Sequence, residues 1–346
     1  MIIVCQSICY SQIGGKQSFA YLHMPSDARV CASGGVNVSA QDHNPQRVLQ
    51  NPALLYADMK NIAGIHHYYY YAGIGNTTMS YSNHVKGRLW AAGFQYMSYG
   101  IANAYDVSGN DIGTTGANDY AMSVSTSEKQ GNFTLGATVK FAGSQFTNFS
   151  SYALFTDIGA LFKHPKRDFT IGLVFKNIGF VLKKYNINTD FVMPFDAQLG
   201  FSYKLEHMPL RFSTTIHHLY AYDIVYADPR IPQSYDLNGN PVYAVVSDAD
   251  KIARHFVFGG EFLFSKGFHA VVGYNHLRRM ELKNTEDMGL SGFSIGFMLK
   301  VRAFEIHYTR AFYHAAGGNN FLGITCLIDK VYKKQTATPV EVPKEN

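Results

Sequence analysis

The chain has 346 residues, of which 14% are aromatic and 16% are charged, and its formal net charge is +5 at neutral pH. Typical globular domains carry about 25% charged residues, so this chain is poor in charge. A mean hydropathy of -0.10 and the lack of an apolar run of roughly 18 residues exclude a helical membrane protein. The mild, scattered positive charge does not predict binding to nucleic acid.

The N-terminal residues 1–11 are apolar and have no basic start. We interpret them as the remnant of a signal peptide that is cleaved close to its end, with a short hydrophobic strand as the alternative. Cys5 and Cys9 lie inside this segment and lack the pattern of a lipoprotein signal. The other two cysteines, Cys31 and Cys326, predict neither a disulfide framework nor a zinc site.

The segment of residues 12–61 contains two motifs built from turn-forming residues. Gly34-Gly35 follows a Pro-Ser-Asp-Ala-Arg stretch, and Asn51-Pro52-Ala53 comes shortly before the first predicted strand. Glycines allow a close approach of the backbone and positive φ, and Pro52 biases Asn51 toward an extended conformation. These motifs therefore predict a tightly folded, non-strand segment.

Short runs of alternating apolar and polar residues follow one another over residues 62–329. In the run 133–141, Phe, Leu, Ala, Val and Phe occupy one phase, and Thr, Gly, Thr and Lys occupy the other. The runs 169–176 and 293–300 have the same pattern. Successive side chains of a strand point to opposite faces, so each run has an apolar and a polar face. Such runs of about ten residues are typical of a transmembrane β-barrel.

The pattern predicts an all-β fold, a transmembrane antiparallel barrel of about 14 strands, and bacterial outer-membrane barrels have an even number of strands. A barrel of this size is wider than its own side chains can fill, since about eight strands close on side chains alone. We therefore expect residues 12–61 to act as a plug inside the lumen. The predicted strands cover residues 62–71, 73–82, 87–102, 117–127, 131–143, 149–163, 168–177, 194–205, 210–218, 252–264, 267–277, 289–300, 302–310 and 320–329.

The connections between these strands alternate between short and long. Outer-membrane barrels have short periplasmic turns and longer outer loops, so this alternation predicts that both chain ends lie in the periplasm. Residues 330–346 then form a polar, proline-containing tail that we expect to be disordered. The long connections are residues 103–116, 178–193, 219–251 and 278–288.

The longest predicted loop, Leu219–Lys251, has more apolar side chains than a solvated loop needs. Aromatic anchors are typical of protein interfaces, so we expect this loop to bind a partner. Asn238-Gly239 predicts a hairpin turn within it, and a calcium loop is the weaker alternative because the downstream Glu is missing. The residues predicted to contact the partner are Tyr226, Ile231, Tyr235, Asn238, Gly239, Val242 and Tyr243.

Sequence motifs for catalysis are missing from the chain. There is no Gly-x-Ser-x-Gly elbow, no His-Glu-x-x-His pair and no phosphate-binding loop, so we predict no enzyme activity, catalytic residue or cofactor. The 14 histidines include the pairs His66-His67 and His217-His218, whose members point to opposite faces if they lie in strands. This favours lumen or interface histidines over a metal site. The run Tyr68–Tyr71 favours an interfacial aromatic girdle over a sugar-binding platform.

The stretch FAYLHMPSDARV, the Gly-Gly pair and the run Asn-Pro-Ala-Leu-Leu resemble the PorV/PorQ outer-membrane barrel family of the type IX secretion system of Bacteroidetes, and its PorQ-type members most of all. This family is related to the long-chain fatty-acid transporters, and the resemblance covers the plug and the barrel. It implies fourteen strands around an N-terminal hatch.

The resemblance further implies a role in the attachment complex that fixes secreted cargo to the cell surface. Its implied partners are outer-membrane lipid and proteins similar to PorZ, PorU and PorV. One alternative is a channel for hydrophobic molecules of the fatty-acid transporter type, against which the polar lumen phase argues. Another is a PorV-like cargo shuttle.

Overall fold

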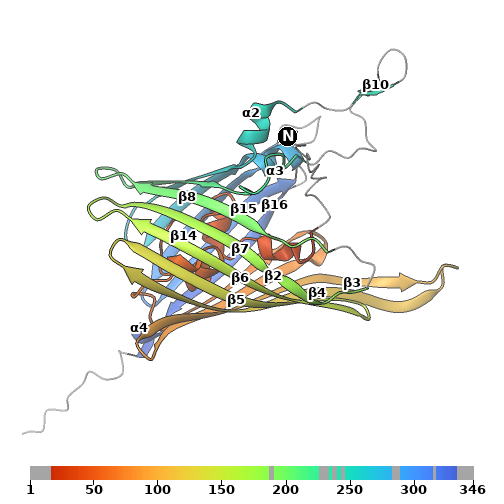
Figure 1. Ribbon diagram of the computed structural model, residues 1–346, viewed down its shortest axis with the longest axis horizontal. Helices are drawn as coiled ribbons and strands as arrows, with labels where there is room; N and C mark the ends of the chain where they lie inside the picture. The colour runs from red at the N-terminus through yellow and green to blue at the C-terminus, as the bar shows by residue number, and fades with distance from the viewer. Residues whose placement is uncertain are drawn as a thin grey trace, which may run out of the picture.

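Among the residues that the structure describes, fourteen strands close into one antiparallel barrel (Figure 1). This computed structural model describes residues 17–186, 191–225, 234–235, 240–242, 246–282, 289–314 and 317–332. Neighbouring strands in the chain pair with one another, and β1 (Ile62–Tyr69) pairs with β16 (Gly317–Leu327) to close the barrel. The other strands of the wall are β2 (Gly75–Val85), β3 (Arg88–Tyr105), β4 (Asp111–Gln130), β5 (Phe133–Phe146), β6 (Phe149–Lys163), β7 (Phe169–Lys183), β8 (Asp196–Lys204), β9 (Leu210–Ile216), β12 (Phe256–Phe262), β13 (Phe268–Asn275), β14 (Phe293–Val301) and β15 (Phe304–His314).

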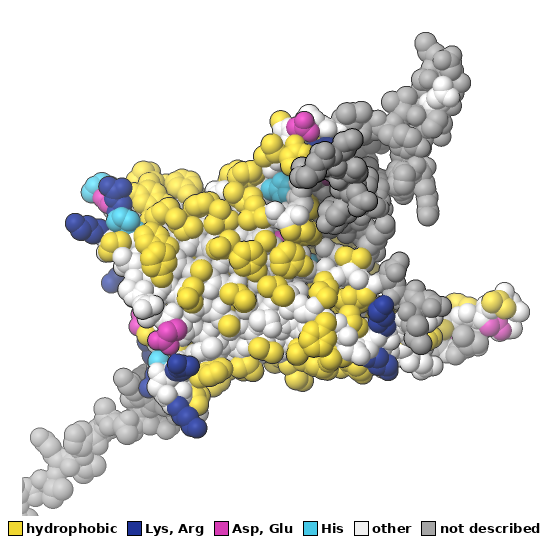
Figure 2. Space-filling model, in the orientation of Figure 1, with side chains coloured by type: hydrophobic (Ala, Val, Ile, Leu, Met, Phe, Trp, Pro, Cys, Tyr) yellow, Lys and Arg dark blue, Asp and Glu magenta, His cyan; other side chains and the backbone are white. Residues whose placement is uncertain are grey.

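The two faces of the wall follow the predicted alternation. Over residues 133–142 of β5, each residue of the phase that begins with Phe133 is exposed, and each residue of the phase that begins with Thr134 is buried. Figure 2 shows apolar side chains over the wall, with charged side chains gathered at its rims. The fold-class prediction is confirmed: each of the fourteen predicted strands overlaps one strand of the barrel.

The connection predicted at residues 103–116 is wrong, because strands β3 and β4 continue through most of it. Their pairing extends past a register shift between Ser98 and Ile101 and reaches Tyr105 and Asp111. The turn that remains is held by Asp106, whose carboxylate accepts hydrogen bonds from backbone N–H groups of the turn, including that of Ser108 at 2.8 Å. The two strands therefore form a ribbon that projects beyond the wall (Figure 1).

Several other predicted strand ends are helical. The strand expected to start at residue 252 is preceded by α2 (Asp248–Ala253), and the strand expected to end at residue 277 gives way to α3 (His276–Leu282). Ser247 caps α2 because its hydroxyl accepts a hydrogen bond from the Asp250 N–H. A further helix, α4 (Ile328–Tyr332), extends past the predicted end of the barrel, so residues 330–332 of the expected tail are helical. Residues 333–346 lie outside the described part of the chain.

The two ends of the barrel differ in their connections. One end, here called the short-turn end, carries turns as brief as residues 302–303 between β14 and β15, whereas the other carries the longest link, between β9 and β12. Within that link, β10 (Ser234–Tyr235) pairs antiparallel with β11 (Pro241–Val242), as the predicted hairpin requires. A short 3-10 helix, η4 (Tyr71–Gly73), lies at the same end in the β1–β2 link.

The segment before β1 folds into short helices that lie inside the barrel (Figure 1). They are η1 (Ala20–His23), α1 (Ala28–Ala32), η2 (Pro45–Leu49) and η3 (Pro52–Leu54). Asp27, Asn44 and Asn51 cap the last three of these helices through their side-chain oxygens. Most of the residues from Ser26 to Leu55 are buried. Within the described ranges, no helix has the length and apolar character needed to cross a bilayer.

Candidate functional site

The main candidate site is the lumen interface, which we define as the contact between residues 17–60 and the inward face of the barrel. Glycines of the wall allow the N-terminal backbone to lie directly against it. A Cβ atom added at Gly136 would overlap the backbone between Pro52 and Ala53, and one at Gly159 would overlap the Asn51 side chain. The motif Asn51-Pro52-Ala53 therefore sits on a surface of β5 and β6 that lacks side chains.

Gly34 and Gly35 make the second close contact. Both have positive φ, +95° and +94°, which glycine adopts without the steric strain that other residues would bear. The Asn275 amide donates to the Gly34 carbonyl at 3.0 Å, and an added Cβ at Gly35 would overlap the guanidinium of Arg278. Both predicted plug motifs thus lie at points of tight contact with the barrel.

Inward hydroxyl groups of the wall satisfy carbonyl groups of the N-terminal segment. Thr309 donates to Ala28 at 2.5 Å, Thr78 to Ser26 at 2.6 Å, and Thr170 to Ser39 at 2.8 Å. Buried carbonyl groups without a partner are costly, and short helices leave many of them free. The Thr and Ser residues on the polar phase of the strands therefore serve as hydrogen-bond partners for the segment they enclose.

A buried ion-pair network joins the segment to the wall. Arg29 pairs with Asp42 at 2.8 Å and with Glu261 of β12, and its side chain is only 7% exposed. Arg47 pairs with Asp42 at 2.9 Å, and Arg211 of β9 pairs with Glu261 at 3.1 Å. Removing one partner of such a network leaves an uncompensated buried charge, so these contacts fix the position of the segment.

The charges of the network persist in spite of burial. Burial raises the pKa of the Asp42 carboxyl, but Arg47 and Arg29 outweigh it and hold that pKa below its ordinary value. Burial lowers the pKa of the Arg29 guanidinium, but Glu261 and Asp42 raise it above its ordinary value. Asp42 and Arg29 therefore form an ion pair at neutral pH.

A second hollow lies at the end of the barrel opposite the short turns. Four of the nine described residues that line this cavity of about 590 Å³ are aromatic, and they include Tyr99, Phe146 and Phe149. At its base, Tyr99 donates to the Asp119 carboxylate at 2.6 Å, and Ser144 also donates to it. The cavity thus combines an apolar wall with a buried carboxylate whose donors are already in place.

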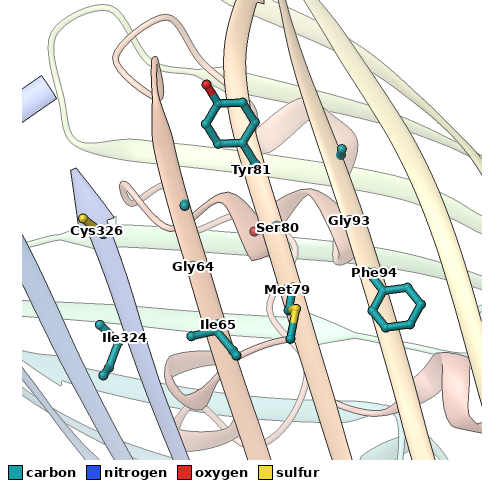
Figure 3. Close-up of a pocket in the computed structure, with 11 residues that line it drawn as sticks. Gly64, Ile65, Met79, Ser80, Tyr81, Gly93, Phe94, Ile324 and Cys326 are labelled. Atoms are coloured by element: carbon teal, nitrogen blue, oxygen red, sulfur yellow. The ribbon is translucent and has the colours of Figure 1, made fainter. Parts of the chain in front are cut away.

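A third hollow of about 470 Å³ lies on the outward face of the wall. Figure 3 shows Ile65, Met79 and Phe94 beside one another on β1, β2 and β3. The hollow arises because the next outward row carries the small residues Ala63 and Ala92. It belongs to the apolar outer surface rather than to the lumen.

The two histidine pairs differ in how their side chains are arranged. His66 is fully buried and contacts Asn44 of the N-terminal segment, whereas His67 bonds Thr77. The expectation of opposite faces is wrong for His217 and His218: β9 ends at residue 216, His218 has positive φ, and the two ring centroids are 4.6 Å apart. No group of three or more His, Cys, Asp or Glu among the described residues has an arrangement that could hold a metal ion.

The tyrosine run does not form a single girdle. Tyr68 is buried inside the barrel, where its ring stacks on Phe321 and its hydroxyl accepts a hydrogen bond from Asn319. Tyr69, its neighbour in β1, is exposed on the outward face. Strand alternation therefore divides the run, and only part of it can lie at the edge of an apolar belt.

The predicted partner-binding residues are only partly described. Tyr235 and Val242 belong to β10 and β11, and their side chains are not described. The other five predicted contacts, Tyr226, Ile231, Asn238, Gly239 and Tyr243, lie outside the described residues. Among the described residues, Lys251 of α2 pairs with Asp223 at 2.8 Å, and Asp250 pairs with Arg254 and His276.

The ion-pair network was not predicted from the sequence, although two signals point to it. Asp27, Arg29, Asp42 and Arg47 bring four charges into a short part of a chain poor in charge. Glu261 is a charged residue at a buried, inward position of β12. What the sequence lacks is the pairing, because Arg29 and Glu261 are 232 positions apart.

Comparison with known proteins identifies the fold alone. A mutant of the monoaromatic hydrocarbon channel TodX matches with a TM-score of 0.51 and 10% identity over 86% of this chain and 96% of that one. CdiB from Acinetobacter baumannii matches with a TM-score of 0.37 and 9% identity over 77% and 59%, respectively. The KdgM porin matches with a TM-score of 0.32 and 6% identity over 77% and 98%. No family model and no curated protein sequence matches the chain.

Proposed function

We propose that this protein is an outer-membrane barrel that acts as an anchor for other proteins and catalyses no reaction, as PorQ-type members of the type IX secretion attachment complex do. The observation that carries the proposal is the lumen interface. A segment held by buried ion pairs, glycine contacts and hydroxyl donors favours a barrel that serves as a scaffold over one that conducts.

The outward face supports the outer-membrane location. Its exposed apolar side chains form a surface that water does not favour and lipid does. If the location is correct, unheated and boiled samples migrate differently on a denaturing gel, and the protein fractionates with outer membranes. A chain that is soluble without detergent contradicts this part of the proposal.

The two plug motifs support the PorQ-type assignment, because Gly34-Gly35 and Asn51-Pro52-Ala53 both make close contacts with the wall. In this proposal residues 12–61 are the plug, and the link between β9 and β12 binds a partner similar to PorZ in a complex that also contains PorU-like and PorV-like proteins. The apolar residues predicted for that link are the proposed contacts.

The test replaces residues 226–245 by a short Gly-Ser linker. This change removes the proposed contacts and leaves α2 with its Lys251–Asp223 and Asp250–His276 pairs. We expect the barrel to insert, the partner to be lost on co-purification, and surface-attached proteins to appear in the medium. The control shortens the turn at residues 106–110. A linker variant that keeps its partner contradicts the role of the link.

A channel for hydrophobic molecules is the second candidate. Two observations favour it: the fold likeness to TodX, a monoaromatic hydrocarbon channel, and the cavity lined by Tyr99, Phe146 and Phe149. If this function is correct, loss of the protein impairs uptake of a hydrophobic nutrient and leaves surface attachment intact. Purified protein would also bind toluene, and Phe146→Ser with Phe149→Ser would weaken that binding.

A further inference from the structure

The short-turn end of the barrel contains an open polar cavity of about 640 Å³, here called the vestibule, that the proposed function does not use. Its floor is formed by residues 41–43 of the N-terminal segment. Its walls come from the ends of β8, β9, β13, β14 and β15 and from the β12–β13 turn, and they include Lys204, Arg211, Lys266 and Lys300.

Positive charge dominates the vestibule. Five Lys and Arg side chains but only two carboxylates, Asp42 and Glu305, are among the described residues that line it. Arg211 pairs with the Glu261 carboxylate at 3.1 Å and with the Asp168 carboxylate at 3.5 Å, and Lys300 pairs with Glu305. The cations that already have partners are thus largely neutralised.

Lys204 and Lys266 supply the excess charge. Within the described part of the chain, neither has an Asp or Glu oxygen within 4.0 Å. His269, which also lines the vestibule, already contacts Glu261 at 3.0 Å. A concave surface with charge of one sign and walls of low dielectric constant concentrates its potential and attracts ions of the opposite sign. The ligand that fits is therefore an anion.

The arrangement of the cations fits a chain of anions better than a single one. Lys204 comes from the end of β8 and Lys266 from the β12–β13 turn, so they extend from different parts of the wall. The volume lies within the roughly 300–1,000 Å³ of typical binding pockets, which exceeds the need of one small anion. Gln41 and His43 add polar groups for a peptide backbone.

We propose that the vestibule binds an acidic peptide segment, with Lys204 and Lys266 pairing with its carboxylates. Short turns of outer-membrane barrels face the periplasm, so the segment would reach the vestibule from that side. This site lies at the end of the barrel opposite the β9–β12 link. Peptide binding in the vestibule therefore does not depend on whether that link binds a partner.

The test uses the full-length protein in an uncharged detergent and a fluorescein-labelled peptide of four glutamates, with binding followed by anisotropy. The variant Lys204→Gln with Lys266→Gln should weaken binding roughly tenfold, as the loss of two solvated ion pairs predicts. The matched control is Lys129→Gln with Lys166→Gln. It removes the same charge from the same rim, outside the vestibule, and should bind as the unchanged protein does.

Further measurements separate the possible ligands. Binding should weaken as salt rises to about 1 M, where the Debye length falls to about 3 Å, and a peptide of four lysines should not bind. The proposal is overturned if the glutamate peptide does not bind, if both double variants bind it equally, or if the lysine peptide binds as tightly. Complete displacement by an equal concentration of inorganic phosphate would show a small-anion site only and would also overturn it. Lys266 is an exposed turn residue, so the single variant Lys266→Gln provides the test if the double variant does not fold.

Discussion

The outward and inward faces of the same strands follow different rules. On β5 the outward phase holds Phe133, Leu135 and Val139, all of which are exposed. The inward phase holds Gly136, on which the backbone at Pro52 rests, and Thr138, which bonds Ser125 at 2.8 Å. A fluid lipid environment requires only that the outward side chains are apolar. The folded N-terminal segment has a fixed surface, so the inward side chains must match its shape and its charges.

This contrast leads to four predictions, of which the largest concerns the buried charges. Arg29→Leu leaves Asp42 and Glu261 without their shared cation, and the loss of one partner of a buried pair costs about 3–5 kcal/mol. We expect the N-terminal segment to detach from the wall, so that a protease cleaves within residues 17–60 and single-channel conductance in a planar bilayer rises.

The control for Arg29 is a solvated pair. Arg167 lies 3.7 Å from Glu206, and its side chain is 64% exposed; Arg167→Leu should cost less than about 1 kcal/mol. If the two substitutions destabilise the protein equally, the lumen network does not hold the segment. An intact protein that already conducts as an open pore would contradict the plug itself.

The second prediction places a charge on the outward face. Val139 lies in the middle of β5 and is exposed, so Val139→Arg should cost about 2–4 kcal/mol if this position lies at the bilayer midplane. Phe133→Arg, at the short-turn end of the same strand, should cost about 0–1 kcal/mol. Denaturant unfolding from lipid vesicles, followed by the fluorescence of Trp90, measures both. Equal costs would show that the wall does not span lipid.

The third prediction compares two neighbouring residues of β5. Gly136→Ala places a methyl group against the backbone of Pro52 and Ala53, and overpacking of this kind typically costs about 1–3 kcal/mol. Ala137→Leu adds a larger group to the outward face, where no fixed neighbour opposes it, and should change stability little. The same unfolding assay decides, and a larger cost for Ala137→Leu would refute the difference between the faces.

The fourth prediction is a pH dependence from His23 in η1. Burial lowers its pKa to about 4 from an ordinary 6.5; Asp196 opposes the shift, while His218, Lys176 and Lys140 add to it. The buried ring favours the neutral form, so its contribution is complete above about pH 6.5 and declines as the pH falls toward about 4. The loss is about 1.4 kcal/mol per pH unit in this window.

Protease cleavage of the N-terminal segment at pH 7 and pH 5 measures this dependence. His23→Gln should reduce the difference between the two pH values, because glutamine does not titrate. An unchanged difference would assign the dependence to other histidines of the lumen, such as His66.

The sequence was most informative where structure depends on neighbouring residues. Alternation located all fourteen strands, and the motifs Asn51-Pro52 and Gly34-Gly35, which predicted a tightly folded segment, lie at two contacts of the N-terminal segment. It was least informative at strand ends: the extension of β3 and β4 to residues 105 and 111 depends on continued pairing with each other. The long-link prediction at 103–116 failed for that reason.

The sequence by itself determined the strand pattern and which phase of each strand is apolar, because alternation follows from backbone geometry within a few residues. Only the tertiary structure decided which polar groups meet in the lumen. Closure of the barrel and its stagger bring Arg29 to Glu261 across 232 positions and Thr309 to Ala28 across 281. No local pattern contains that pairing, since it exists only when all the strands are in register around the segment they enclose.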